Sequence, residues 1–202
     1  MYEYLDKLLE NSKDKIRIEF NRLSVTGFDE LNVMNTRKLT KDMYDRLLSE
    51  NNKMYLKVAI KAYSSAGGNG EPPNEDWLVG ILAMYNLITG YLYDKEAERK
   101  RLRLNEQILT AREYSDRAMH ISSLRRAADL WYTQTAQYGI SVVDEATLKA
   151  YKDMGIKQVQ WVSKDDGREC DDCASRDGKI YKITEVPPKS HYGCRCYLRP
   201  KE

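Results

Sequence analysis

Five residues with metal-binding side chains are concentrated near one end of the 202-residue chain. They follow C-x2-C and H-x2-C-x-C spacings and are Cys170, Cys173, His191, Cys194 and Cys196. Zinc takes four thiolate or imidazole ligands in a tetrahedron, and two cysteines three positions apart can direct both sulfurs to one ion from a single tight turn. The separation of the two groups lies within the interval typical of zinc sites. The spacing therefore predicts one bound zinc ion.

Five candidates compete for four ligand positions, and the spacing leaves the choice open. Cys194 and Cys196 would point to the same side of a strand, so either of them, or His191, stands outside the first shell of ligands. The alternative is that these residues are free thiols or disulfides. All four cysteines fall between residues 170 and 196, whereas a disulfide scaffold would distribute them along the chain, which favours zinc. A cysteine-rich set saturates the metal, which favours a structural ion over a catalytic one.

The residues before this cluster have the pattern of a helical body. Apolar residues recur at helical intervals from Leu5 to Leu23, and again after Thr40, which we expect to be an N-cap. The segment SSAGGNGEPPN at 64–74 predicts a loop, followed by a helix that starts at Glu75. Trp77, Trp131 and Trp161 are expected in the core, because each buries a large apolar surface.

No Gly or Pro interrupts residues 91–138, and we expect two helices there, joined by a tight turn. Gly139 fits the position just after a helix, and Asp144 is expected to cap a shorter helix that stops at Gly155. Beyond it, residues 156–163, 179–183 and 194–198 have the composition of short strands. The predicted fold class is mainly α, with a helical, partner-binding body at 1–139 and a small zinc-stabilised α+β module at 140–202.

Composition excludes some classes of protein. No apolar run approaches the roughly 20 residues that a membrane span needs, and the first residues lack the apolar core of a secretory signal, so we expect no membrane contact and a reducing compartment. The formal net charge of +2 makes no case for nucleic-acid binding by the chain as a whole.

The order of motifs from Leu130 to Pro200 carries a family resemblance. It comprises TQTAQYG at 133–139, LKAYKDMGIKQVQWVSKDDGREC at 148–170, CASRDGKIY at 173–181 and PPKSHYGCRCYLRP at 187–200. This order resembles the C-terminal part of the phage Mu F-like head morphogenesis family, also called phage minor head or minor capsid proteins. The resemblance implies a virion protein made in the bacterial host, which associates with the portal or the major capsid protein and takes no small-molecule substrate.

A surplus of basic residues marks positions 95–126, where Arg99, Lys100, Arg101 and Arg103 are candidate contacts to phosphate or to a partner. Because acidic residues are interleaved throughout, we favour a solvated helix face with ion pairs between successive turns as the explanation. Contact with DNA is the sharper hypothesis, and it predicts binding that weakens steeply with salt.

The alternative function is a zinc-dependent nucleic-acid-binding protein or an enzyme, an HNH-like nuclease. Such a nuclease needs a catalytic His beside a metal-binding His or Asn, and only His191 is available near the cysteines. His120 lies in a helical stretch without a catalytic partner, and we assign it no role. The sequence therefore predicts a non-enzymatic assembly protein.

Overall fold

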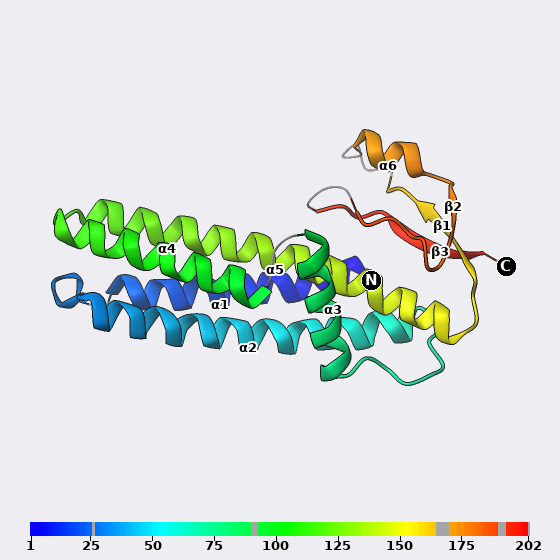
Figure 1. Cartoon of the computed structure of the whole chain (residues 1–202), viewed down its shortest axis with the longest axis horizontal. Coiled ribbons are helices and arrows are strands. Elements are labelled where there is room, and N and C mark those ends of the chain that lie inside the picture. Colours follow the sequence, from blue (N-terminus) through cyan, green and yellow to red (C-terminus); the bar gives the residue numbers. More distant parts are fainter. Residues whose placement is uncertain (26, 90–92, 165–169, 190–192, 202) are drawn as a thin grey trace. The chain divides into compact units, whose positions relative to one another are not determined.

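The computed structural model describes residues 1–25, 27–89, 93–164, 170–189 and 193–201, and the side chains of 85–96 lie outside this description (Figure 1). The helices are α1 (Tyr2–Val25), the short 3-10 helix η1 (Phe28–Glu30), α2 (Val33–Ser65), α3 (Glu75–Thr89), α4 (Tyr93–Glu113), α5 (Arg117–Asp153) and α6 (Asp171–Arg176). The strands are β1 (Gln158–Val162), β2 (Ile180–Lys182) and β3 (Tyr197–Lys201). The predicted fold class is confirmed: a mainly helical chain ends in a small module with a sheet.

Contacts divide the chain into two units, each assembled from separate segments. The first unit, the sheet unit, comprises Met1–Asp6, Tyr55–Ile81 and Ala136–Glu202. The second, the bundle unit, comprises Lys7–Met54 and Leu82–Thr135. Long helices contribute residues to both units, so the division does not follow the order of the sequence.

The core of the bundle unit is formed by apolar faces of α1, α2, α4 and α5. Phe20 of α1, Tyr44 of α2, Ile108 of α4 and Trp131 of α5 all belong to one buried cluster. The rings of Tyr44 and Trp131 meet edge to face with centroids 4.6 Å apart. This is the packing that the helical spacing of apolar residues predicts, since each amphipathic helix buries one stripe.

Two buried hydrogen bonds also join helices of the bundle unit. The Thr40 hydroxyl of α2 lies 2.6 Å from Oδ1 of Asn105 on α4. Asn51 of α2 donates through Nδ2 to Oγ1 of Thr135 on α5, at 2.9 Å. Thr40 is therefore not an N-cap as expected, because α2 begins earlier and the side chain of Asn32 accepts the backbone N–H of Asn35 at 2.9 Å.

The long helical stretch after residue 91 consists of two helices, as predicted. The turn between them contains Ser115, whose φ of 53° is left-handed, and Asp116, whose carboxylate accepts the N–H of Met119 at 2.8 Å. The same turn is tied to η1, because Arg117 forms an ion pair with Asp29 at 3.0 Å. The turn that the sequence left unplaced thus lies at residues 114–116.

In the sheet unit, α5 runs without interruption past Gly139 and Asp144, so the predicted helix end and the separate capped helix are both wrong. A Cβ on Gly139 would lie only 2.8 Å from Cδ1 of Leu5, which explains glycine at this position by close approach of α1. Asp144 is a helix-interior residue whose carboxylate bonds to side chains distant in sequence. The predicted end near Gly155 is confirmed, with Gly155 at a φ of +76°.

The three strands form an antiparallel sheet in the order β2-β1-β3. In the central strand, Val159 pairs with Tyr181 and Pro200, and Trp161 pairs with Leu198. The first two strands agree with the prediction, whereas the third begins at Tyr197, after the cysteines rather than at them. Trp131 and Trp161 are buried as expected, but Trp77 is only half-buried, because Leu78 and Leu82 occupy the inner face of α3. None of the described helices is both long and apolar enough to cross a membrane.

Candidate metal centre

The first cysteine pair is positioned by the start of α6. Cys170 is the N-cap residue, and its sulfur accepts the backbone N–H of Cys173 at 3.4 Å. Cys173 lies in the first turn of this helix and is buried. A short helix replaces the turn that the sequence predicted, because the N-cap bond and Asp171 and Asp172 at the positive end of the helix stabilise its first turn.

The second cysteine pair lies in the segment that leads into β3. Gly193 takes a φ of +74°, and the next residues bring the sulfurs of Cys194 and Cys196 toward Cys173. The sulfurs of Cys173, Cys194 and Cys196 lie within 4.8 Å of one another, and those of Cys173 and Cys194 are 3.5 Å apart. The expectation that Cys194 and Cys196 share a side is thus met by the structure.

The geometry of these three sulfurs fits a metal ion better than it fits a disulfide. Sulfurs bound tetrahedrally at 2.3 Å from zinc are separated by about 3.8 Å, whereas a disulfide requires about 2.05 Å. No disulfide joins the four cysteines, and the separation of the Cys173 and Cys194 sulfurs lies near the tetrahedral value. Three buried cysteines can therefore hold one metal ion from three corners.

Because these thiols are buried, their charged thiolate forms are disfavoured. Burial raises the pKa of Cys173, which hydrogen bonds with the other three cysteines raise further. Burial also raises the pKa of Cys194, while the positive charge of Lys189 acts in the opposite direction. Because metal binding requires thiolates, the ion must displace these protons, and its affinity will fall as the pH falls.

Aromatic and aliphatic side chains surround the cysteine cluster. Trp161 of β1 is 2% exposed and shares a buried cluster with Cys173, Cys194 and Cys196. The guanidinium of Arg176 lies 5.3 Å from the centre of the Trp161 ring, and the ring of Tyr181 meets it edge to face at 6.5 Å. The tryptophan therefore separates the sulfurs from solvent on the side of the sheet.

A buried polar network fixes the connector that precedes the second cysteine pair. Nζ of Lys189 forms an ion pair with Asp144 of α5 at 2.8 Å and also contacts the hydroxyl of Tyr2. That hydroxyl donates to Asp144 at 2.7 Å and lies 3.2 Å from the carbonyl oxygen of Cys196. Burial raises the pKa of Asp144, and the charge and hydrogen bonds of Lys189 and Tyr2 only partly oppose this effect.

Further bonds hold the cysteine segment on the helices of the sheet unit. Arg195, between the two cysteines, binds both carboxylate oxygens of Asp6 at 2.8 and 2.7 Å. The hydroxyl of Tyr151 donates to the carbonyl of Leu198 at 3.2 Å. A bidentate arginine contact has a defined geometry in addition to its favourable energy. It therefore fixes the direction in which the neighbouring cysteines point.

Of the five predicted ligands, the structure brings three together and places a fourth beside them. Cys170 is half-buried and is not within the group of three sulfurs. His191 lies outside the described residues. Sequence reasoning missed Tyr2, Asp6 and Asp144 as supports of the site, because their partners are at least 45 residues away and no local spacing signals such pairs.

A comparison with models of known protein families shows to which family the chain belongs. Residues 90–199 match the model of the family described as Phage Mu protein F like protein, which is more than half of the chain. The chain belongs to this family. The match begins well before Leu130, so it covers α4, α5 and most of the segment 158–201, which contains the strands and the cysteines and which we call the cysteine module. Membership of the family suggests a phage head morphogenesis protein. No curated protein and no solved structure matches this Mu F-like chain.

The basic residues singled out in the sequence separate onto different faces of α4. Arg101 binds Glu98 through two nitrogens, one of them at 2.6 Å from Oε2, and its side chain is only 11% exposed. Arg99, Lys100 and Arg103 instead line a hollow that they share with Arg126 of α5. Within the family match, the structure thus groups three of the four candidate residues at one place.

Proposed function

We propose that this chain is a non-enzymatic minor head protein of a tailed bacteriophage. Its proposed role is to associate with the portal, or with the major capsid protein, during head assembly or DNA packaging, and to remain in the virion. Membership of the Mu F-like family is the observation that carries this proposal. The helices supply partner-facing surface, and the metal-bound module supplies a rigid platform.

We also propose that the metal is zinc and that its role is structural. Three cysteine sulfurs form a soft ligand set, which suits zinc better than calcium or magnesium. The three thiols are buried beside Trp161, which suits a saturated structural ion better than a catalytic ion with an open position. Cys170 and His191 remain candidates for the fourth ligand.

Co-expression with the portal protein of the same phage tests the assembly role. We expect the two proteins to co-purify, and we expect the chain among the proteins of assembled heads by mass spectrometry. A Cys173→Ser variant should lose co-purification if the module forms the platform. Absence of the chain from purified particles, together with cleavage of plasmid DNA in the presence of divalent metal, would contradict the proposal and favour the nuclease alternative.

A further inference from the structure

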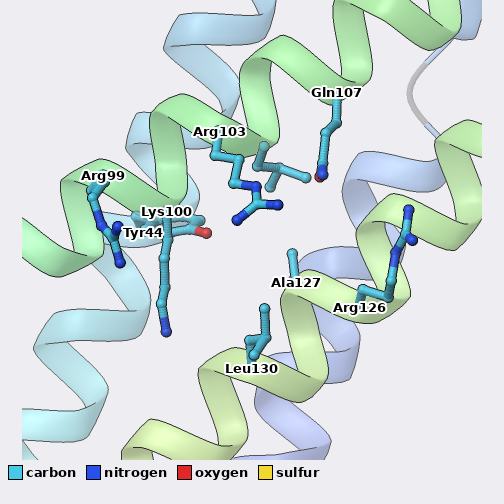
Figure 2. A pocket seen from close by; sticks show the side chains of 9 residues that line it. Tyr44, Arg99, Lys100, Arg103, Gln107, Arg126, Ala127 and Leu130 are labelled. Carbon is cyan, nitrogen blue, oxygen red and sulfur yellow. The ribbon is translucent and has the colours of Figure 1, made fainter.

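A hollow on the bundle unit lies between α4 and α5 and has a volume of about 220 Å³ (Figure 2). Its polar side chains come mainly from α4, which contributes Arg99, Lys100, Arg103 and Gln107. Across from them, α5 contributes Arg126 together with apolar residues, among them the small side chain of Ala127. Figure 2 shows the side chains of α4 extending toward α5 across this hollow.

Among the residues whose side chains the structure describes, the lining of the hollow carries four positive charges and no negative one. Arg99, Lys100, Arg103 and Arg126 are its charged members. The interleaved acids of α4 are partly accounted for elsewhere, since Glu98 is bound by Arg101 on another face of the helix. A concave surface lined by one sign of charge focuses the field and concentrates counter-ions of the opposite sign. The hollow is therefore a site for an anion.

Three of the cations, Arg99, Lys100 and Arg103, lie within about one turn of α4, and Arg126 lies across from them on α5. Arg99, Arg103 and Gln107 are four positions apart, so they succeed one another along α4 at intervals of about 6 Å. Three of the four cations are arginines, whose planar guanidinium groups bind phosphate oxygens in a bidentate manner. Four cations suit an anion with several phosphate groups better than they suit a single phosphate ion.

The apolar part of the lining distinguishes between kinds of polyanion. Tyr44, the aromatic residue of the lining, is only 3% exposed, so it offers no face on which a base of single-stranded nucleic acid can stack. Leu130 is the exposed large apolar side chain of the lining, at 54%, whereas protein interfaces have an apolar centre of several such residues. These features favour the backbone of a duplex over a single strand or an acidic protein.

We propose that this hollow binds the phosphate backbone of duplex DNA, with Arg99, Lys100, Arg103 and Arg126 contacting phosphates. The inference goes beyond the proposed assembly role and does not depend on it, because duplex binding is a property of the isolated chain. The proposed site differs from the four candidate residues chosen from the sequence, since it adds Arg126 and excludes Arg101. It predicts binding that is independent of base sequence.

Fluorescence anisotropy with a short labelled duplex, over a series of salt concentrations, tests the proposal. The pocket variant is Arg103→Gln with Arg126→Gln. Its matched control is Arg17→Gln with Arg125→Gln, which removes two exposed charges from a different hollow of the same unit. Because all four residues are exposed, circular dichroism should show the same folded state for both variants.

We expect the pocket variant to bind the duplex about tenfold more weakly than the wild type, and the slope of log affinity against log salt to decrease by about 2, as for two lost phosphate contacts. The control should retain most of the affinity. The proposal is overturned by absence of binding at low salt, or by equal losses in both variants. Tighter binding of a single strand, or of polyglutamate, would also overturn it. None of these outcomes bears on co-purification with the portal.

Discussion

The bundle unit and the cysteine module bury very different material. The core cluster of the bundle contains fourteen buried residues among those described, all of them apolar or aromatic and drawn from helices far apart in sequence. The buried cluster of the module contains Trp161 and three cysteines, with Tyr181, Val186 and Leu198 only partly buried around them. Apolar burial can stabilise the first by itself. In the second cluster three of the four buried residues are cysteines, so we infer that its stability depends on what the sulfurs bind.

Removal of the metal should have the largest effect of the tests that separate the two regions, and it should unfold the cysteine module but not the bundle unit. Zinc contributes on the order of 10 kcal/mol to the folding of small zinc modules, so a strong chelator should unfold the sheet while the bundle stays folded. Hydrogen exchange should show loss of protection in β1, β2 and β3, with protection retained in α4. The control is chelator already saturated with zinc. Unchanged protection of the strands after metal removal would contradict the comparison.

Single substitutions sharpen the assignment of ligands within the module. Cys173→Ser should abolish stoichiometric zinc binding, because this sulfur lies at the centre of the cluster. Cys170→Ser is the matched variant that tests the role of Cys170. A serine hydroxyl can also accept the backbone N–H of residue 173, so this variant preserves the N-cap bond. If Cys170 only caps α6, this variant retains zinc, and if it is the fourth ligand, zinc is lost. Metal analysis by mass spectrometry reads both outcomes.

A core substitution in the bundle unit should destabilise the bundle and leave the cysteine module intact. Leu104→Ala removes a side chain that is 1% exposed and should lower the free energy of unfolding of the bundle by about 2–5 kcal/mol. Leu102→Ala, on the same helix but 46% exposed, makes the same chemical change and should cost about 0.5 kcal/mol or less. Urea denaturation followed by circular dichroism measures both. Zinc content should be unchanged in each variant, and its loss would show that the two regions are not independent.

Titration of His120, which lies in the bundle unit, should produce the smallest of these effects. His120 is 2% exposed, and its ring lies beside that of Phe28. Burial lowers its pKa below the usual value near 6.5. Below pH 6.5 the unfolded chain therefore binds more protons than the folded one, so the stability of the bundle falls as the pH falls.

A His120→Leu variant tests this pH dependence, because leucine retains the packing and cannot titrate. The slope of unfolding free energy against pH, between about 6.5 and 5, should be shallower in the variant than in the wild type. Each unit by which the pKa is lowered corresponds to about 1.4 kcal/mol. Identical slopes would show that the histidine gains a proton in the folded state without cost.

The sequence predicted those features that depend on local spacing. The cysteine cluster, the strand containing Trp161 and the two helices after residue 91 all follow from patterns of a few residues. Gly139 was misjudged because a glycine after a helical stretch usually marks its end, whereas here it accommodates Leu5. Asp144 resembled a cap, and only the folded chain shows that its partners are Tyr2 and Lys189.

The candidate phosphate site was likewise predicted only in the part that depends on local sequence. The sequence identified the basic stretch of α4, but its acids and bases alternate along the chain, so their separation onto faces depends on the orientation of the helix. Arg126 joins the group only through the packing of α5 against α4. Thr40 was also misassigned, since a buried threonine inside a helix interrupts the apolar pattern and resembles a start signal.

The bond between Thr40 and Asn105 has a consequence for the alignment of helices in the bundle unit. Apolar helix faces tolerate sliding past one another by a turn, about 5.4 Å, because one leucine or alanine contact can replace another. A slide of that size would leave the Thr40 hydroxyl bonded to the Thr36 carbonyl of its own helix, but it would remove this partner from the buried Oδ1 of Asn105. The pair therefore selects one axial register of α2 against α4, which apolar packing alone would leave degenerate.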